Sequence, residues 1–119
     1  MGYELKMYLA TKHSHSEYRQ VIGTIDLCKL GRGKLADFIQ DSKAESEDVF
    51  VYASDGNTRI TEDSYGDKLW EVDVEKLLPV MVEANKKEPY RRFNLAIPMM
   101  ETLLKDFKEV TPVAIFYGY

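Results

Sequence analysis

The chain has 119 residues, of which 45% are apolar and 30% charged, and its formal net charge is −4. This composition excludes a disordered chain, and the length is that of one domain spanning residues 1–119. No apolar run approaches the roughly 18–20 residues of a membrane span, and the acidic balance argues against duplex nucleic acid as a partner. The single cysteine, Cys28, cannot form an intramolecular disulfide, which suits a reducing compartment, so we expect a cytoplasmic protein.

The first half of the chain carries strand patterns and one helical pattern. Apolar residues alternate with polar ones over 3–10 and again over 18–28, which predicts two strands joined as a long hairpin. Gly23 interrupts the second strand and indicates a β-bulge or a close neighbour. A short amphipathic helix is predicted over 35–42, and a second hairpin over 48–61.

The second half predicts two amphipathic helices and a final strand. Asp73 and Asn94 are the expected N-cap residues of the two helices. The continuous apolar run 113–117 is typical of a strand in the centre of a sheet. The order is therefore strand, strand, helix, strand, strand, helix, helix, strand. This order predicts an α+β fold with a mainly antiparallel sheet of about five strands and two or three helices on one face.

Two short segments contain residues that burial and solubility do not explain. The acidic segment, residues 62–67, places Glu62, Asp63 and Asp67 around a tyrosine and a glycine. Paired carboxylates can perform general acid–base chemistry when burial separates their pKa values, and this is the basis of an alternative hypothesis of a small hydrolase. The same residues can also serve as turn, helix-capping and ion-pairing groups, which is the interpretation we favour.

The basic segment, residues 89–93, precedes the second long helix. Tyrosine and arginine are enriched in the energetically dominant parts of protein interfaces, so an exposed segment of this kind favours contact with a partner. The alternative, which is the interpretation we favour for these residues, places Tyr90 and Phe93 in the core, with the arginines paired to Asp63 or Asp67. The residues predicted to form a binding site are Tyr65, Asp67, Tyr90, Arg91 and Arg92.

A weaker pattern lies between the second strand and the first helix. Gly31, Gly33 and Lys34 could bring backbone amides and a charge to an anion or a nucleotide, although the spacing does not match a P-loop. The alternative is a plain turn. The only two histidines, His13 and His15, lack enough neighbouring ligands for a metal, so no metal or other cofactor is expected.

Four stretches carry most of the remaining distinctive residues. They are Val-Ile-Gly-Thr-Ile-Asp-Leu-Cys-Lys-Leu-Gly at 21–31, Asp-Ser-Tyr-Gly-Asp at 63–67, Tyr-Arg-Arg at 90–92 and Tyr-Gly-Tyr at 117–119. Together they resemble small uncharacterised proteins encoded by bacteriophages and prophages. The resemblance implies an accessory role in a bacterial or phage-infected cytoplasm. It favours protein binding over metabolism and assigns no functional residue.

These observations favour a small interaction module that binds a protein partner or itself. No complete catalytic constellation is visible, so a binding protein is favoured over an enzyme. The alternatives are an anion- or nucleotide-binding domain and the hydrolase that would use the carboxylates of residues 62–67.

Overall fold

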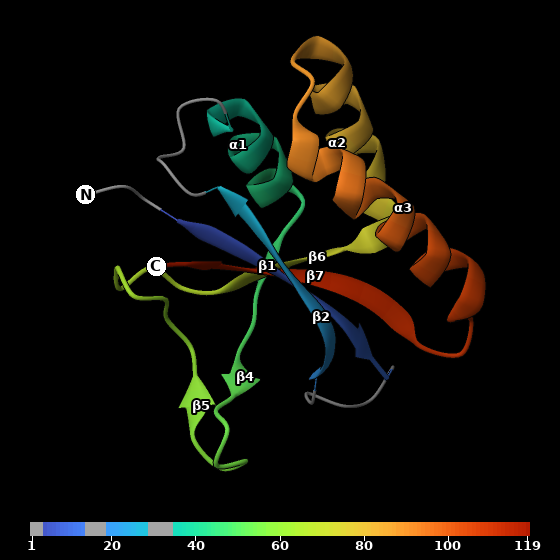
Figure 1. The fold of residues 1–119 in the computed structure, drawn as a ribbon. Helices are drawn as coiled ribbons and strands as arrows, with labels where there is room; N and C mark the ends of the chain where they lie inside the picture. Colours follow the sequence, from blue (N-terminus) through green and yellow to red (C-terminus); the bar gives the residue numbers. More distant parts are fainter. Residues whose placement is uncertain (1–3, 14–18, 29–34) are drawn as a thin grey trace.

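A computed structural model describes residues 4–13, 19–28 and 35–119 of the chain. Its strands are β1 (Leu5–Lys12), β2 (Arg19–Cys28), β3 (Glu47–Asp48), β4 (Val51–Tyr52), β5 (Arg59–Ile60), β6 (Trp70–Asp73) and β7 (Thr111–Gly118). Its helices are α1 (Ala36–Ala44), α2 (Val74–Lys87) and α3 (Arg91–Asp106). Within these ranges the fold is α+β, as predicted: an antiparallel five-stranded sheet in the order β2-β1-β7-β6-β3, with three helices over one face (Figure 1).

The predicted hairpin and the predicted central strand are both confirmed. β1 pairs with β2 along its whole length, and the register shifts between Leu9 and Ala10, close to Gly23. β7 lies between β1 and β6, and its residues from Pro112 to Phe116 are buried. A strand in this position needs apolar side chains on both faces, which explains the uninterrupted apolar run.

Each face of the sheet has its own core. On the helix side, Trp70 of β6 stacks on Phe116 of β7, with ring centroids 4.1 Å apart. The other face carries a smaller apolar cluster, against which Val51 and Ile60 of the β4–β5 hairpin pack. Burial of apolar surface on both sides is the main favourable term that holds such a small domain together.

The sheet also contains strands that the sequence did not indicate. β6 is four residues long and includes the acidic residues Glu71 and Asp73, which hide its strand character. The strand expected over 48–53 divides into β3, which joins the large sheet, and β4, which pairs with β5 in a separate two-stranded sheet. The predicted hairpin turn around Asp55 is nevertheless present, because β4 and β5 pair antiparallel.

The start of α2 agrees with the predicted cap residue, whereas the start of α3 does not. Asp73 does precede α2, but its side chain makes no capping hydrogen bond and lies 3.3 Å from the Lys12 ammonium group instead. Asn94 is not a cap, since α3 begins three residues earlier, after Tyr90. Asn85 of α2 explains the shift: its Oδ1 accepts the backbone N–H of Tyr90 at 2.8 Å, and its Nδ2 donates to Asn94 Oδ1 at 2.9 Å.

The stability of the β4–β5 turn should depend on pH. Asp55 accepts hydrogen bonds from the Thr58 hydroxyl at 2.6 Å and from the backbone N–H groups of Thr58 and Asn57. These bonds favour the charged carboxylate and lower the pKa of Asp55 to about 2 from its ordinary value of 3.8. The turn should therefore keep this stabilisation above the unfolded pKa and lose it as the pH falls through about 2.

An NMR titration of the side-chain carboxyl carbon of Asp55 tests this prediction. Thr58→Val removes the hydroxyl donor, which is the largest cause of the shift, and should raise the pKa of Asp55. A midpoint near the ordinary carboxyl value in the unmodified protein would contradict the prediction.

Candidate functional site

The acidic segment forms a tight turn whose polar groups bind one another. Asp63 Oδ1 accepts the backbone N–H groups of Tyr65 at 2.8 Å and Asp67 at 3.1 Å. Its Oδ2 accepts the N–H of Gly118 in β7 at 3.2 Å. Gly66 has a φ of 81°, a conformation that favours glycine. Asp63 therefore acts as a turn residue, and these contacts lend no support to an acid–base role.

The basic segment packs against β2. Phe93 is buried, and its ring centroid lies 5.2 Å from that of Tyr90. The Tyr90 hydroxyl donates to the carbonyl oxygen of Leu27, and the Arg92 guanidinium donates to the carbonyl oxygen of Asp26. The structure thus agrees with the alternative interpretation for Tyr90 and Phe93, whereas Arg92 binds the backbone of β2 instead of a carboxylate.

The two segments do not pair directly within the described chain, but Asp26 links them. Its carbonyl binds Arg92, and its Oδ1 accepts the Tyr119 hydroxyl at 2.8 Å. The carbonyl of Tyr119 in turn accepts the Tyr65 hydroxyl at 2.8 Å. The hydrogen bond to the Asp26 carboxylate raises the pKa of Tyr119 well above its usual range. Tyr65 and Arg92 are therefore joined through Tyr119 and Asp26, and not by a direct contact.

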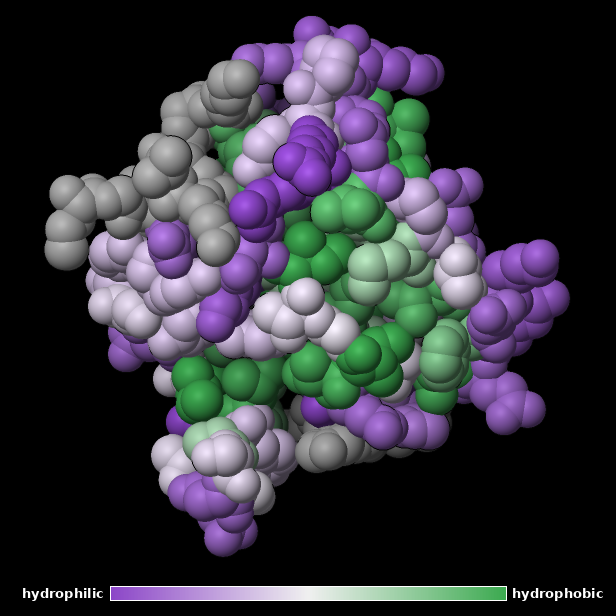
Figure 2. Space-filling model, in the orientation of Figure 1, coloured by the Kyte–Doolittle hydropathy of each residue, from purple (hydrophilic) through white to green (hydrophobic). Residues whose placement is uncertain are grey.

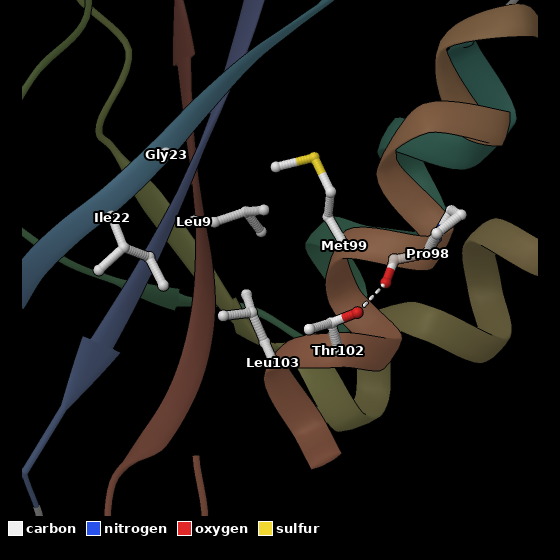
Figure 3. Close-up of a pocket in the computed structure, with 7 residues that line it drawn as sticks. All are labelled: Leu9, Ile22, Gly23, Pro98, Met99, Thr102 and Leu103. Carbon is white, nitrogen blue, oxygen red and sulfur yellow. Dashed lines mark hydrogen bonds between the residues drawn. The ribbon is translucent and has the colours of Figure 1, made fainter. Parts of the chain in front are cut away.

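An apolar groove lies between β2 and α3. We call it the β2–α3 groove; its volume is about 330 Å³. Figure 2 shows apolar surface in this part of the molecule, and Figure 3 shows the Met99 side chain reaching from α3 toward β2. Ile22 and Met99 are each 42% exposed, which is unusual for large apolar side chains on facing elements. The groove is lined by Leu9, Ile22, Gly23, Pro98, Met99, Thr102 and Leu103.

Gly23 is the reason that the groove is open. Its backbone does not have a positive φ, so the conformation does not require glycine. A Cβ atom placed on Gly23 would have only Met99 Cε nearby, at 3.8 Å, which is ordinary van der Waals contact. Glycine in the interior of a strand weakens the strand, and it often marks a place where another backbone or a ligand approaches closely. The sequence indicated Gly23, but none of the residues predicted as binding residues lines this groove.

A second hollow continues along the same two elements. Its volume is about 720 Å³, and it shares Met99 with the β2–α3 groove. Arg91 and Arg92 line its far end, at the start of α3. Arg92 holds the β2 backbone, whereas Arg91 is exposed. The predicted residues Arg91 and Arg92 therefore flank the groove without forming its floor. The other residues that line this hollow are Thr24, Ile25, Asp26 and Leu95.

Three other sequence predictions concern an anion site, a metal and a membrane. Gly31, Gly33 and Lys34, the predicted anion site, lie outside the described residues, as does His15. In the part of the chain that the structure describes, no three His, Cys, Asp or Glu side chains are grouped so that they could hold a metal ion. No helix in that part is long and apolar enough to cross a membrane.

The chain was also compared with known proteins. Comparison with models of protein families, with curated proteins and with solved structures found no match to this chain.

Proposed function

We propose that this protein is an interaction module that binds an extended segment of a partner protein along the outer edge of β2. The observation that carries the proposal is the hollow beside Gly23, on an edge strand. Among the described strands only β1 pairs with β2, so the other side of β2 presents backbone groups to an added strand. This holds for the part of β2 before Asp26, because Arg92 and Tyr90 already bind the carbonyl oxygens of Asp26 and Leu27. Alternate side chains of the added strand would enter the apolar groove, which is a recurring mode of peptide recognition.

The chemistry of the groove favours binding over catalysis. Of the residues that line it, only Thr102 has a polar side chain. Its hydroxyl donates to the carbonyl of Pro98 in the preceding turn of α3, at 2.9 Å. Apolar walls with few polar groups provide a binding surface, whereas a chemical step needs a nucleophile or a proton-transfer group. We place this binding in the cytoplasm, in keeping with the single cysteine of the chain.

A single strand suits this edge better than a second copy of the protein does. Antiparallel pairing of two β2 edges would relate the copies by a two-fold axis perpendicular to the sheet. Both helix layers would then lie on the same side, and each α3 would face the other across the joint. α3 is held close to β2 by Tyr90 and Arg92, so a second copy would have to bring its own α3 up against this one. We therefore propose that a segment of a partner protein, and not a second copy of this chain, binds at this edge.

Filling the groove should weaken binding without harming the fold. Gly23→Val places a β-branched side chain toward Met99, where the structure leaves room. Because glycine destabilises a strand by roughly 0.5–1 kcal/mol, the free energy of unfolding should stay the same or rise by up to about 1 kcal/mol. Peptides selected on the unmodified protein from a random displayed library should bind this variant at least about tenfold more weakly, a loss of about 1.4 kcal/mol.

The matched control lies on the same strand. Val21 is 43% exposed and pairs with Ala10, which belongs to the core of the opposite face. Val21→Thr should leave peptide binding within about twofold, because Val21 lines neither hollow. Full binding by Gly23→Val, or a selection that enriches no peptide, would refute the proposal. A dimer in light scattering that Gly23→Val dissociates would replace the partner segment by a second copy.

A further inference from the structure

The positive charge of Arg91 beside the groove indicates which kind of side chain a bound segment would carry. Arg91 is exposed at the end of the second hollow, and no ion pair joins it to a carboxylate among the residues that the structure describes. The chain as a whole has a net charge of −4, whereas two arginines and one acidic residue, Asp26, line the second hollow. Arginine binds carboxylates through paired, charge-assisted hydrogen bonds.

We propose that the partner segment carries an acidic side chain that binds Arg91 and an apolar side chain that enters the groove beside Gly23. This inference rests on the proposed function. Met99 marks the groove on α3 and follows Arg91 by eight residues. At about 1.5 Å per helical residue the two lie roughly 12 Å apart along the axis. An extended chain covers that distance in about four residues. Residues four apart on a strand point to the same face, so both side chains can face the protein.

The direction of β2 sets the order of the two side chains. β2 runs from Gly23 at the apolar groove to Asp26 at the arginine end. Antiparallel strand pairs are slightly more stable per residue than parallel pairs and are more common. An antiparallel segment therefore enters with its acidic residue first, and its motif is Glu-x-x-x-Leu.

The arginine end suits a side-chain carboxylate better than a phosphate or a chain terminus. Arg92 is already committed to the Asp26 carbonyl, which leaves one exposed guanidinium for the ligand. The Asp26 carboxyl group belongs to the same hollow and disfavours a doubly charged ligand. Terminal carboxylates are usually held by clustered backbone N–H groups, whereas this hollow offers arginine side chains.

Defined peptides test the motif. The probe is the end-blocked, fluorescently labelled peptide Ser-Glu-Thr-Val-Thr-Leu-Ser. It is compared with a peptide that has Gln in place of Glu, a peptide that has phosphoserine in place of Glu, and the reversed sequence. Anisotropy at low ionic strength should show the Glu peptide binding about fivefold more tightly than the Gln peptide, the upper range for one exposed ion pair. Both of the other peptides should bind more weakly than the Glu peptide.

Arg91→Gln should remove the preference for the Glu peptide and leave the affinity for the Gln peptide unchanged. Lys105→Gln makes the same change of charge in the last turn of α3, outside both hollows, and should keep the preference. Equal binding of the Glu and Gln peptides, lost in Gly23→Val, would overturn the acidic motif and leave the groove as the binding site. Peptide binding that Gly23→Val does not weaken would overturn both proposals. Tighter binding of the phosphoserine peptide would replace the carboxylate by a phosphate, and failure of all four peptides would overturn the motif.

Discussion

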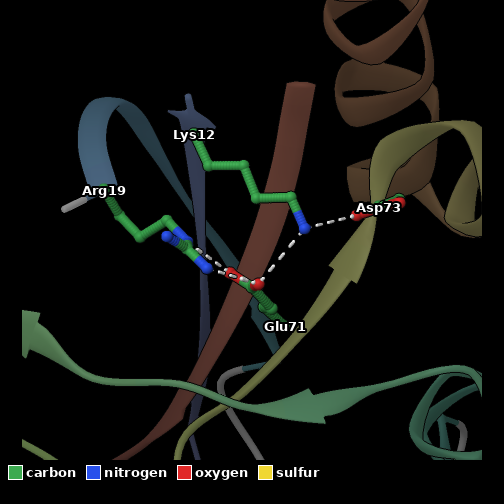
Figure 4. Close-up of polar contacts among 4 residues, drawn as sticks. All are labelled: Lys12, Arg19, Glu71 and Asp73. Carbon is green, nitrogen blue, oxygen red and sulfur yellow. Dashed lines mark hydrogen bonds and ion pairs between the residues drawn. The ribbon is translucent and has the colours of Figure 1, made fainter. Parts of the chain in front are cut away.

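Replacement of Arg19 by methionine is expected to lower the free energy of unfolding by about 3 kcal/mol. Arg19 Nε lies 2.8 Å from Glu71 Oε2, and Arg19 Nη2 donates to Glu71 Oε1 at 2.9 Å (Figure 4). The Glu71 side chain is only 4% exposed. Without Arg19, the buried carboxylate would keep, among the residues that the structure describes, the Lys12 ammonium group, 3.7 Å away. Removing one partner of a buried ion pair is costly because the other charge stays out of water.

Two further variants separate this cost from a general loss of packing. The double variant Arg19→Met/Glu71→Met removes both charges and should recover most of the stability, to within about 1 kcal/mol of the unmodified protein. The exposed pair of Lys68 and Asp48, 3.5 Å apart with side chains 73% and 71% exposed, provides the control. Lys68→Met should cost less than about 0.5 kcal/mol. Denaturant unfolding measures all these variants, and a double variant less stable than Arg19→Met alone would contradict the argument.

The Arg19–Glu71 pair also explains why β6 was not predicted. The pattern of Trp70 to Asp73 places two acids in four residues, and an acid in a strand is expected to face water. Glu71 is buried because its partner approaches from β2, 52 residues away in sequence. Apolar periodicity carries no information about a pairing of this kind. β1, with its alternating apolar residues, and β7, with its uninterrupted apolar run, were predictable because apolar side chains account for their burial.

In the candidate site, too, some features were visible in the sequence and others depended on the tertiary fold. Gly23 was visible in the sequence as an irregularity in a strand, but its significance depends on Met99, which only the tertiary fold places opposite it. Arg92 was expected to bind an acidic side chain, yet the start of α3 faces the backbone of β2, and a carbonyl is the acceptor within reach. The interpretation that pairs the arginines with the acidic segment would bring the two segments together. In the structure Arg92 binds the Asp26 carbonyl, Tyr65 binds the Tyr119 carbonyl, and the Tyr119 hydroxyl binds the Asp26 carboxylate. Sequence indicated which residues were unusual, and packing decided their partners.

Truncation of Phe93 is the second change with a large expected effect. Phe93 is 1% exposed, and its ring lies 4.8 Å from that of Phe38 in α1 and 5.2 Å from that of Tyr90. It therefore joins the first turn of α3 to α1 and to the residue that binds β2. Phe93→Ala should lower the free energy of unfolding by about 3–5 kcal/mol, because it removes the buried ring and leaves a cavity.

The neighbouring Leu95 is the control, because it lies on the same helix and is 60% exposed. Leu95→Ala should cost less than about 0.5 kcal/mol. Phe93→Leu, which keeps most of the apolar volume, should cost about 1–2 kcal/mol and allows a measurement even if the alanine variant does not fold. In Phe93→Leu, amide hydrogen exchange should accelerate first in the opening turn of α3, where the ring holds Tyr90 and Arg92 against β2. Equal losses in Phe93→Ala and Leu95→Ala would show that this aromatic contact does not anchor α3, and that another contact keeps the β2–α3 groove in place.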